Sequence, residues 1–317
     1  MPRIEQVTQE SIVHAADLLR EGGLVAFPTE TVYGLGANAA DDKPVLRIFE
    51  AKRRPRFNPL IVHVRDIEQA EKLAVFDAPA LRLAQAFWPG PLTLVLPRRF
   101  AAKLSLLASA GLETVALRAP SHPVARQLLA ESQLAIAAPS ANRSGAVSAT
   151  HATHVAESLG GAIDLVLDGG PAPLGLESTI VGFEANRPVL LRPGALERDT
   201  IEAVIGELHH YESKVIASPG QLRSHYAPRT PIRLDAPSVR SDEALLAFGP
   251  DAPANASITR NLSPSGDLRE AAANLFAMLH ELDAAGCSHI AVMPVPETGL
   301  GEAINDRLRR AAAPKDK

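Results

Sequence analysis

Polar segments recur along the chain at points where apolar, strand-like runs end. The first, Pro28–Leu35 (PTETVYGL), follows the apolar run Leu24–Phe27 and brings two threonine hydroxyls, a carboxylate and a phenol. A capped turn explains one such side chain and leaves the others unexplained. We therefore interpret this segment as a candidate binding loop for a polar ligand.

A second segment, Lys52–Leu60 (KRRPRFNPL), places four cationic side chains among five consecutive residues. Basic residues at the end of a helix often only offset the helix dipole on a solvated face. Here two prolines stiffen the exit into the next strand. A rigid cationic hook of this kind suits the binding of an oligophosphate.

Further polar groups stand at the ends of other apolar runs. Pro139–Ser148 (PSANRSGAVS) follows one run and offers hydroxyl, amide and backbone donors to an anion. Thr114 and Arg118 bracket a second run, Glu177 opens a third, and Leu191–Gly194 closes a fourth. Open α/β sheets hold ligands at strand ends, so these segments predict one shared site. The candidate phosphate partners are Lys52, Arg54, Ser140, Asn142, Ser148 and Arg192.

The expected chemistry is positioning and charge neutralisation. Charge-assisted hydrogen bonds contribute about 1.5–3 kcal/mol each, so a handful would hold a triphosphate despite a net charge of −4. The sequence contains no Walker-type phosphate loop, no G-x-S-x-G segment and no obvious paired-carboxylate or histidine-centred acid/base site. This pattern favours nucleotidyl transfer with Mg²⁺.

Three other patterns carry less weight. Gly34–Ala39 (GLGANA) matches a relaxed dinucleotide fingerprint but lacks the acidic residue expected about 20 positions further on, so we interpret it as a turn. His151 and His154 have metal-ligand spacing without a third ligand, which is typical of a solvated helix face. Cys287, the single cysteine, is interpreted as a packing residue and fits a reducing compartment.

The elements that must position these segments alternate between helical and strand-like periodicity up to residue 208. This pattern predicts an α/β (α+β-like) domain with a twisted mixed sheet. Helices are expected near residues 8–20, 42–52, 66–73, 79–87, 121–131, 150–158 and 198–207. Strands are expected at residues 24–27, 60–64, 92–96, 114–118, 134–138, 165–167, 179–181 and 189–191.

The length of 317 residues exceeds the usual ceiling for one core, about 250–300, and predicts a large domain with a smaller one. Residues 209–231 have little periodicity and three prolines, which indicates a linker or functional loop. A strand–helix–strand–helix order follows, expected at residues 244–248, 266–285, 289–292 and 300–312. It predicts a small Rossmann-like or flavodoxin-like layer. The predicted boundaries are 1–208 (catalytic domain), 209–232 (linker and lid) and 233–317 (small domain).

Overall composition excludes several classes. A chain with 46% hydrophobic and 21% charged residues is neither disordered nor fibrous. A net charge of −4 and 4% aromatics argue against a basic coat protein for nucleic acid and against a base-stacking platform. Neither a signal peptide nor a membrane-spanning apolar run is apparent, so we expect a cytoplasmic protein without membrane contact.

The polar segments together resemble the YrdC-type L-threonylcarbamoyladenylate synthases. The resemblance covers about the first 200 residues in one collinear order. It rests on PTETVYGL (28–35), the Lys52-x-Arg54 pair with Asn58-Pro59-Leu60, PGPLT (89–93), VALRAPSHP (115–123), PSANRSG (139–145), ESTIV (177–181) and LRPG (191–194). SPGQLRSHYAPRTPI (218–232) and the small domain resemble the linker and C-terminal domain of the long, two-domain form.

The resemblance implies an open mixed sheet of the YrdC type and a defined reaction. L-Threonine, bicarbonate and ATP, the last with Mg²⁺, would give threonylcarbamoyl-AMP and pyrophosphate. The product would pass to the complex that modifies the adenosine beside the anticodon of certain tRNAs, with possible weak tRNA contact by this chain.

Carried over residue by residue, the resemblance also implies two sets of site residues. L-Threonine would contact Thr31, His63, Arg118, Ala138 and Ser178. ATP would contact Arg54, Asn58, Thr114, Ser140, Ser148, Arg192 and Tyr226, with Lys52 and Asn142 completing the phosphate set. Lys52 and Arg54 are the implied catalytic residues, Tyr226 the implied lid, and the metal ligands are left unassigned.

Two positions depart from the family pattern. Arg53 stands where glycine is common, and Gly182 where aspartate is common.

Two other functions stay open. The first alternative is an RNA- or ribosome-binding module that uses Lys52–Arg56. The low aromatic content and acidic pI weigh against this alternative. The second is carbamoyl transfer on a related sheet, which usually comes with cysteine or zinc modules that the sequence lacks.

Overall fold

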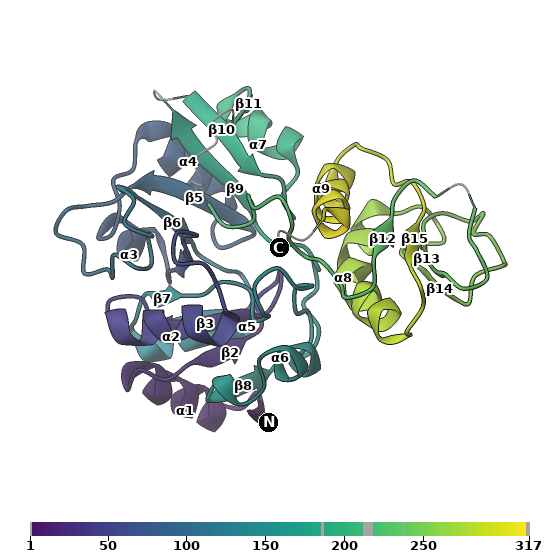
Figure 1. The fold of residues 1–317 in the computed structure, drawn as a ribbon. Helices are drawn as coiled ribbons and strands as arrows, with labels where there is room; N and C mark the ends of the chain where they lie inside the picture. Colours follow the sequence, from purple (N-terminus) through teal and green to yellow (C-terminus); the bar gives the residue numbers. More distant parts are fainter. Residues whose placement is uncertain (1, 185–186, 212–217, 237, 315–317) are drawn as a thin grey trace.

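The computed structural model describes residues 2–184, 187–211, 218–236 and 238–314 of the chain. Two α/β units lie side by side (Figure 1). The larger unit carries the N-terminus. The smaller one carries helices α8 (Leu268–Ala284) and α9 (Leu300–Ala312), which lie on its side facing the larger unit.

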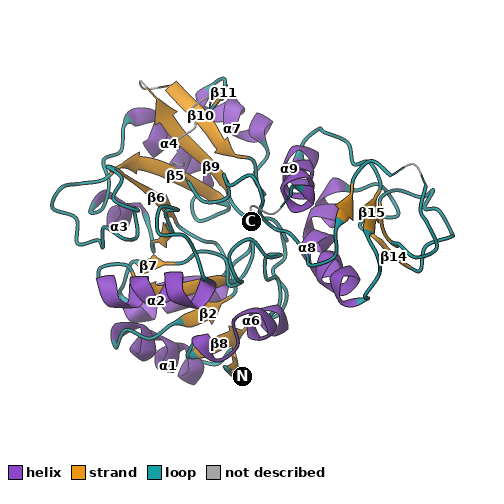
Figure 2. Ribbon diagram, viewed as in Figure 1, coloured by secondary structure: helices purple, strands orange, loops and turns teal. Residues whose placement is uncertain are grey.

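An eleven-stranded sheet forms the centre of the larger unit, in the order β1-β8-β2-β3-β7-β4-β6-β5-β9-β10-β11. It mixes parallel pairs, such as β4 with β6, and antiparallel pairs, such as β5 with β6, and it is twisted (Figure 2). The predicted mixed sheet is therefore confirmed. Its strands are β1 (Arg3–Gln6), β2 (Val25–Phe27), β3 (Gly34–Asn38), β4 (Ile61–His63), β5 (Leu92–Pro97), β6 (Thr114–Arg118), β7 (Ile136–Ala137), β8 (Leu165–Asp168), β9 (Thr179–Glu184), β10 (Arg187–Arg192) and β11 (His209–His210).

The helices of this unit lie close to their predicted positions. They are α1 (Gln9–Arg20), α2 (Asp42–Lys52), α3 (Ile67–Glu71), α4 (Ala78–Phe87), α5 (Pro123–Ser132), α6 (Ala152–Leu159), the 3-10 turn η1 (Gly160–Ala162) and α7 (Arg198–Ile205). Side chains cap the first turns of α1 to α4: Thr8 forms a capping box with Ser11, and Asp41, Asp66 and Asp77 each accept a backbone N–H bond.

Buried apolar residues pack around the sheet in three clusters. One large core joins the sheet to residues of α2, α4, α6 and α7, and a second joins α1 and α5 to β2 and β8. A third cluster consists of buried strand residues alone: Ile61, Val95, Ala116, Ile180, Val189 and Leu191. The polar segments at the ends of these same strands form the walls of the pocket described below.

Strand β3 corrects the interpretation of Gly34–Ala39 as a turn. The segment pairs with β2 and β7 in the middle of the sheet. A Cβ atom on Gly36 would lie 2.8 Å from Phe27 Cε1 and 2.9 Å from Ile136 Cγ2. Glycine stands here because neighbouring side chains cross over the strand, a packing requirement that the sequence pattern alone does not reveal.

The smaller unit contains a four-stranded parallel sheet in the order β12-β15-β13-β14. Its strands are β12 (Ile232–Arg233), β13 (Ala244–Ala247), β14 (Ile258–Asn261) and β15 (Ile290–Val292). The sequence pattern predicted β13, β15 and both helices but missed β12 and β14. None of the helices that the structure describes is long and apolar enough to cross a membrane.

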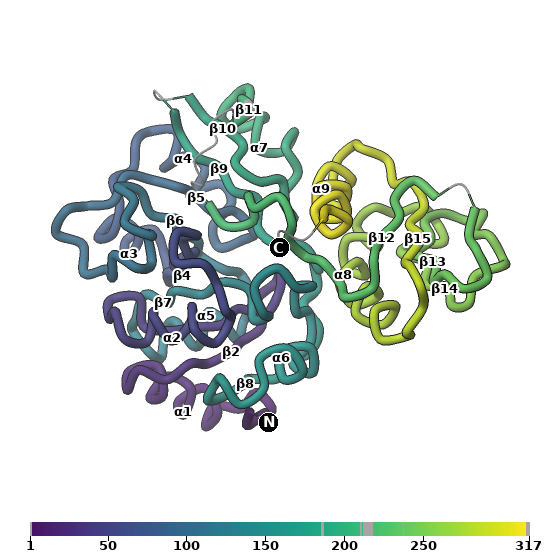
Figure 3. The backbone as a smooth tube through the Cα atoms, in the orientation of Figure 1, coloured from purple at the N-terminus to yellow at the C-terminus, as the bar shows by residue number. Residues whose placement is uncertain are grey.

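The segment between β11 and β12 joins the two units. Its described part, residues 218–231, forms neither helix nor strand and passes between the units as an irregular tube (Figure 3). β11 belongs to the large sheet and β12 to the small one. The linker therefore runs between two sheets and past the strand ends that carry the polar segments.

The crowding around Gly36 leads to a stability prediction. Gly36→Ala is expected to lower the free energy of unfolding by about 1–3 kcal/mol, because the added methyl group overpacks the sheet. The control is Gly161→Ala, since a Cβ on Gly161 meets nothing within 4 Å. That variant should stay within about 0.5 kcal/mol of the parent. Urea unfolding followed by circular dichroism measures both, and equal stabilities would contradict the packing argument.

Candidate active site

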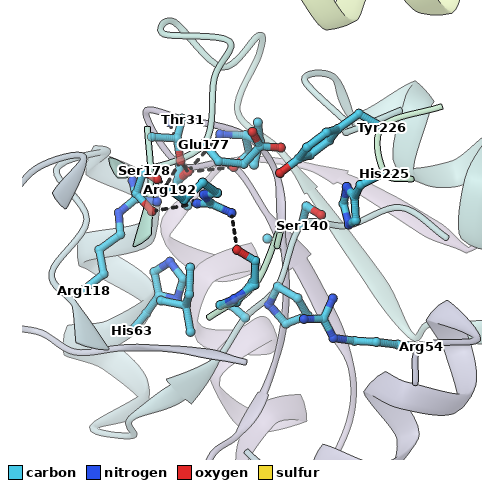
Figure 4. Close-up of a pocket in the computed structure, with 18 residues that line it drawn as sticks. Thr31, Arg54, His63, Arg118, Ser140, Glu177, Ser178, Arg192, His225 and Tyr226 are labelled. Carbon is cyan, nitrogen blue, oxygen red and sulfur yellow. Dashed lines mark hydrogen bonds between the residues drawn. The ribbon is translucent and has the colours of Figure 1, made fainter. Parts of the chain in front are cut away.

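A pocket lies where the polar segments of the larger unit meet the linker (Figure 4). Many of the predicted site residues line it together: Thr31, Arg54, His63, Arg118, Ala138, Ser140, Ser178, Arg192 and Tyr226. Glu177 and His225 also line the pocket and belong to neither predicted set. Arg118 and Arg54 lie on opposite sides of it, with Arg192 between them.

Arg118 organises one end of the pocket. Its guanidinium is buried and donates from Nε to the Gly90 carbonyl (3.2 Å), from Nη1 to Thr31 Oγ1 (2.8 Å) and from Nη2 to Glu30 Oε1 (2.6 Å). Each terminal nitrogen carries a second N–H group. A planar fork held in this way can bind a ligand carboxylate without first being ordered.

Glu30 is the counter-charge that makes this end possible. Its carboxylate also accepts backbone N–H bonds from Ser121 (3.1 Å) and His122 (3.3 Å). Burial by itself would raise the pKa of Glu30, but the charge and hydrogen bonds of Arg118 hold that pKa below its usual range. Glu30 belongs to neither set of predicted site residues. The sequence signal for it is a carboxylate beside Thr31 in a segment expected to share a site with Arg118, because an arginine removed from water requires a partner.

His63 stands on β4 beside Arg118. Burial, reinforced by the Arg118 charge, lowers the pKa of His63 to about 3, so the imidazole is neutral at physiological pH. Its Nδ1 atom is buried and has no hydrogen-bond partner in the structure, and its ring meets Phe27 edge-on at 6.2 Å. A neutral ring with one unsatisfied nitrogen suits hydrogen bonding to a small polar ligand.

Arg54 organises the opposite end. It is buried and donates from Nε to the Asn58 carbonyl (3.1 Å) and from Nη2 to Asn58 Oδ1 (2.7 Å) and the Pro59 carbonyl (2.7 Å). Burial lowers the pKa of Arg54 to about 10, which still leaves the side chain cationic at neutral pH. Arg53, the departure from the family pattern, ends α2 in the left-handed conformation with an exposed side chain.

Several predicted ligands of the phosphates lie behind the pocket wall. Lys52 Nζ donates to the carbonyls of Ser140 (2.5 Å) and Asn142, and burial together with the Arg54 charge lowers the pKa of Lys52 well below its usual value. Asn142 donates its side-chain amide to the Arg143 and Ala146 carbonyls, both at 2.9 Å. These contacts fix the loop that presents Ser140, and neither side chain lines the pocket.

Three further predicted ATP residues do not line this pocket. Asn58 supports Arg54, and Ser148 Oγ donates to Glu177 Oε1 at 2.5 Å. Thr114 lies in a separate hollow that Gly182 also lines. A Cβ on Gly182 would lie 2.8 Å from Leu191 Cδ1, so the residue that replaces the common aspartate leaves room for that leucine.

The linker closes the pocket. Arg192 donates to the Ser178 carbonyl (2.7 Å) and the Pro219 carbonyl (3.3 Å), which ties β10 to the linker. A Cβ on Gly220 would lie 2.8 Å from both Arg192 Cδ and Tyr226 Oη, and Gly220 has φ +86°, so glycine permits this close approach. Tyr226 is buried, and its hydroxyl has no hydrogen-bond partner in the structure.

His151 and His154 do not form the solvated helix face that was predicted. Both are half-buried, with ring centroids 4.9 Å apart, and His154 stacks on His280 of α8 at 3.9 Å. Burial lowers the pKa of His154 to about 3. Within the described ranges, no group of three or more His, Cys, Asp or Glu side chains is arranged to hold a metal ion.

Comparisons with known proteins agree in both units. The family model described as "Telomere recombination" matches residues 17–194, and the one described as "Threonylcarbamoyl-AMP synthase, C-terminal domain" matches residues 196–313. The threonylcarbamoyl-AMP synthase of Pyrococcus abyssi is 43% identical over 97% of this chain and 96% of its own length. That of Bacillus subtilis is 44% identical over 95% and 92%. The crystal structure of P. abyssi Sua5 complexed with L-threonine superposes with a TM-score of 0.90, at 41% identity over 98% of this chain and 97% of that one.

The buried Glu30–Arg118 pair leads to a second stability prediction. Glu30→Gln leaves the Arg118 charge buried without its partner, so the free energy of unfolding is expected to fall by about 3–5 kcal/mol at neutral pH. The matched control is Glu68→Gln, which breaks the exposed Glu68–Lys72 pair and should cost under about 0.5 kcal/mol.

The same measurement has a pH dependence with a defined sign. The pKa of Glu30 is lower in the folded protein, so its contribution is present above the ordinary carboxyl pKa and is lost as pH falls through the folded value. The stability gap between parent and E30Q should therefore narrow in acid. A gap that is absent at pH 7, or that widens on acidification, would contradict this account.

Proposed function

Because the chain belongs to the threonylcarbamoyl-AMP synthase family, in its long two-domain form, we propose that it is a nucleotidyltransferase that forms threonylcarbamoyl-AMP and pyrophosphate from L-threonine, bicarbonate and ATP. One observation carries the proposal at the level of the site. The same pocket has the Arg118 fork with Thr31 and Ser178 at one end and the buried Arg54 cation at the other.

L-Threonine fits the Arg118 end of the pocket. Its carboxylate accepts hydrogen bonds from the remaining N–H groups of Arg118. Its side-chain hydroxyl forms hydrogen bonds with the hydroxyls of Thr31 and Ser178. The Ala138 methyl group accommodates the small apolar part of the ligand, and the neutral His63 ring adds no competing positive charge beside the amino group. The assignment is supported by the fact that all of these residues line the same pocket.

ATP fits the Arg54 end, with its triphosphate toward Arg54, Arg192 and Ser140. Lys52 acts through the loop it anchors, because its Nζ already binds the Ser140 and Asn142 carbonyls. Asn142 and Lys52 thus shape the phosphate-binding loop. We also propose that Asn58, Thr114 and Ser148 contact ATP. These three residues do not line the pocket in this structure, so their contacts with the nucleotide would lie outside it.

The reaction proceeds in two bond-forming steps. The threonine amine attacks the carbon of bicarbonate, a C–N bond forms and water leaves, which gives a carbamate. A carbamate oxygen then attacks the α-phosphorus of ATP, the bond to the bridging oxygen breaks and pyrophosphate leaves with that electron pair. Arg54 and Arg192 stabilise the negative charge that accumulates on the phosphates.

The ATP phosphates would hold a magnesium ion, and the ion would supply Lewis-acid stabilisation of the leaving group. The donor set of the pocket fits this arrangement. Its carboxylates, Glu30 nearby and Glu177 in the lining, are both committed to arginine. The phosphates themselves are therefore the proposed ligands of the ion.

The linker keeps water from the labile product. Tyr226, His225 and Pro219 form one wall of the pocket, so the linker must move for substrates to enter and for the product to leave. We propose that the released product passes to the tRNA-modifying complex. A surface for RNA built on Lys52–Arg56 is less favoured, because Lys52 and Arg54 point inward and leave Arg53 and Arg56 as its exposed cations.

The reaction is tested by pyrophosphate release from the purified chain. Release is expected to require L-threonine, bicarbonate and ATP together, and to fall to background when EDTA removes Mg²⁺. Mass spectrometry should detect threonylcarbamoyl-AMP in the complete mixture. Release that continues without threonine or bicarbonate would overturn the proposed reaction.

The phosphate end is tested by two neighbouring arginines. Arg54→Gln is expected to raise the KM for ATP about tenfold or more, because a charge-assisted contact contributes about 1.5–3 kcal/mol. Arg53→Gln removes an exposed charge one residue earlier and should leave the KM for ATP within about twofold. Steady-state kinetics with threonine and bicarbonate saturating measure both, and equal KM values for the two variants would remove Arg54 from the site.

A further inference from the structure

An arginine from the smaller unit is buried against the pocket of the larger one. Arg307 lies on α9 and has no exposed surface. It donates from Nε to Glu177 Oε2 (2.8 Å), from Nη2 to the Pro193 carbonyl (2.9 Å) and from Nη1 to Asp306 Oδ2 (2.6 Å). Burying a guanidinium is costly unless its donors are satisfied, and here each nitrogen has a partner.

Glu177, the partner of Arg307, is part of the pocket wall. One carboxylate oxygen binds Arg307 and the other accepts the Ser148 hydroxyl at 2.5 Å. Glu177 also directly precedes Ser178, so a shift of its backbone moves a proposed threonine-binding residue. Arg307 therefore acts from another domain on the groups that shape both ends of the site.

The same guanidinium supports the lid. It lies over the Tyr226 ring, 5.0 Å from the ring centroid, and the ring of Phe276 on α8 stacks with Tyr226 at 5.7 Å. Arg310, one turn further along α9, donates to the Leu222 carbonyl (2.7 Å) and accepts the His225 N–H at its own carbonyl (3.2 Å). Glu177 and Tyr226 lie on the same side of the pocket (Figure 4).

We propose that Arg307 is a positioning residue of the active site, which holds the Glu177 carboxylate and the Tyr226 ring in the geometry that ATP binding requires. The inference rests on the proposed function and assigns the C-terminal unit a direct part in it. Arg307 does not line the pocket, and in this proposal it acts through Glu177, Ser148 and Tyr226. The C-terminal unit is in this way a component of the site as well as an attachment point for the linker.

The electrostatics give the proposal a readout that a purely structural role would not move. Burial would raise the pKa of Glu177, but Arg307 and Arg192 together with hydrogen bonds hold that pKa below its usual range. The charged and titratable groups around this cluster are Arg307 and Asp306 on α9, Arg192 on β10, and His225 and Tyr226 on the linker. With Arg307 neutralised, burial remains, so the pKa of Glu177 must rise.

The central variant is Arg307→Gln. It is expected to weaken ATP binding about tenfold or more, measured by titration calorimetry with ATP alone, and to move the acid limb of the kcat/KM profile to higher pH. Arg307→Lys keeps a positive charge near Glu177 but loses the planar fork. It should return the acid limb toward that of the parent while ATP affinity stays intermediate.

The matched control is Arg198→Gln. Arg198 on α7 pairs with Glu302 on α9 at 2.6 Å, so this variant breaks an ion pair between the same two units at a distance from the pocket. It should leave ATP affinity and the acid limb unchanged. An equal effect of R198Q and R307Q would show that only domain docking matters and would overturn the proposal.

Two results separate this inference from the proposed function. If the parent chain binds no ATP, the proposed function fails. If the parent binds ATP and folded R307Q binds it equally well with an unshifted pH profile, the positioning role fails while the function stands. Should R307Q not fold, as judged by circular dichroism, R307K decides: parental ATP affinity in R307K would likewise overturn the role of the fork.

Discussion

Buried positive charge is the constraint on which the rest of the structure depends. The cations enclosed around the pocket are Lys52, Arg54, Arg118, Arg192 and Arg307. Removing such groups from water is unfavourable unless carbonyls or carboxylates replace the lost solvation. Glu30 and Glu177 supply the carboxylates, and the loops at strand ends supply the carbonyls. The loop conformations, the lid and the docking of α9 all place carbonyls or carboxylates beside the buried cations in place of water. An anionic ligand would add further negative charge beside them.

The mixed sheet is what brings these groups together. Arg118 ends β6, Arg192 ends β10 and Ser178 precedes β9, three strands of one half of the sheet. Lys52 and Arg54 reach the same place from the end of α2, where the left-handed Arg53 reverses the chain. Because these residues come from separate elements packed around one sheet, the sheet sets their spacing.

Sequence reasoning recovered the parts of this arrangement that depend on local pattern. Apolar runs predicted most strands of the large sheet, and polar segments at their ends predicted most of the pocket lining. The prediction was wrong where it depended on tertiary packing. Gly36 was interpreted as a turn residue, but it lies in a strand whose neighbours Phe27 and Ile136 leave no room for a side chain. The sequence also does not show the direction of a side chain. Lys52 was expected to face the phosphates, but its ammonium group binds the Ser140 carbonyl behind the pocket wall. Arg307 gave no signal, because only the docking of the two units brings it to Glu177.

Glu177 and Arg307 are 130 residues apart in the chain, so they leave the ribosome at different times. A ribosome completes the large sheet well before it adds α9. Until that helix emerges and docks, Glu177 lacks its cation and the Tyr226 ring lacks one of its supports. A nascent chain, or one shortened before α9, therefore carries the sheet without a finished pocket. Completion of the pocket therefore waits until α9 has been made and has docked on the larger unit.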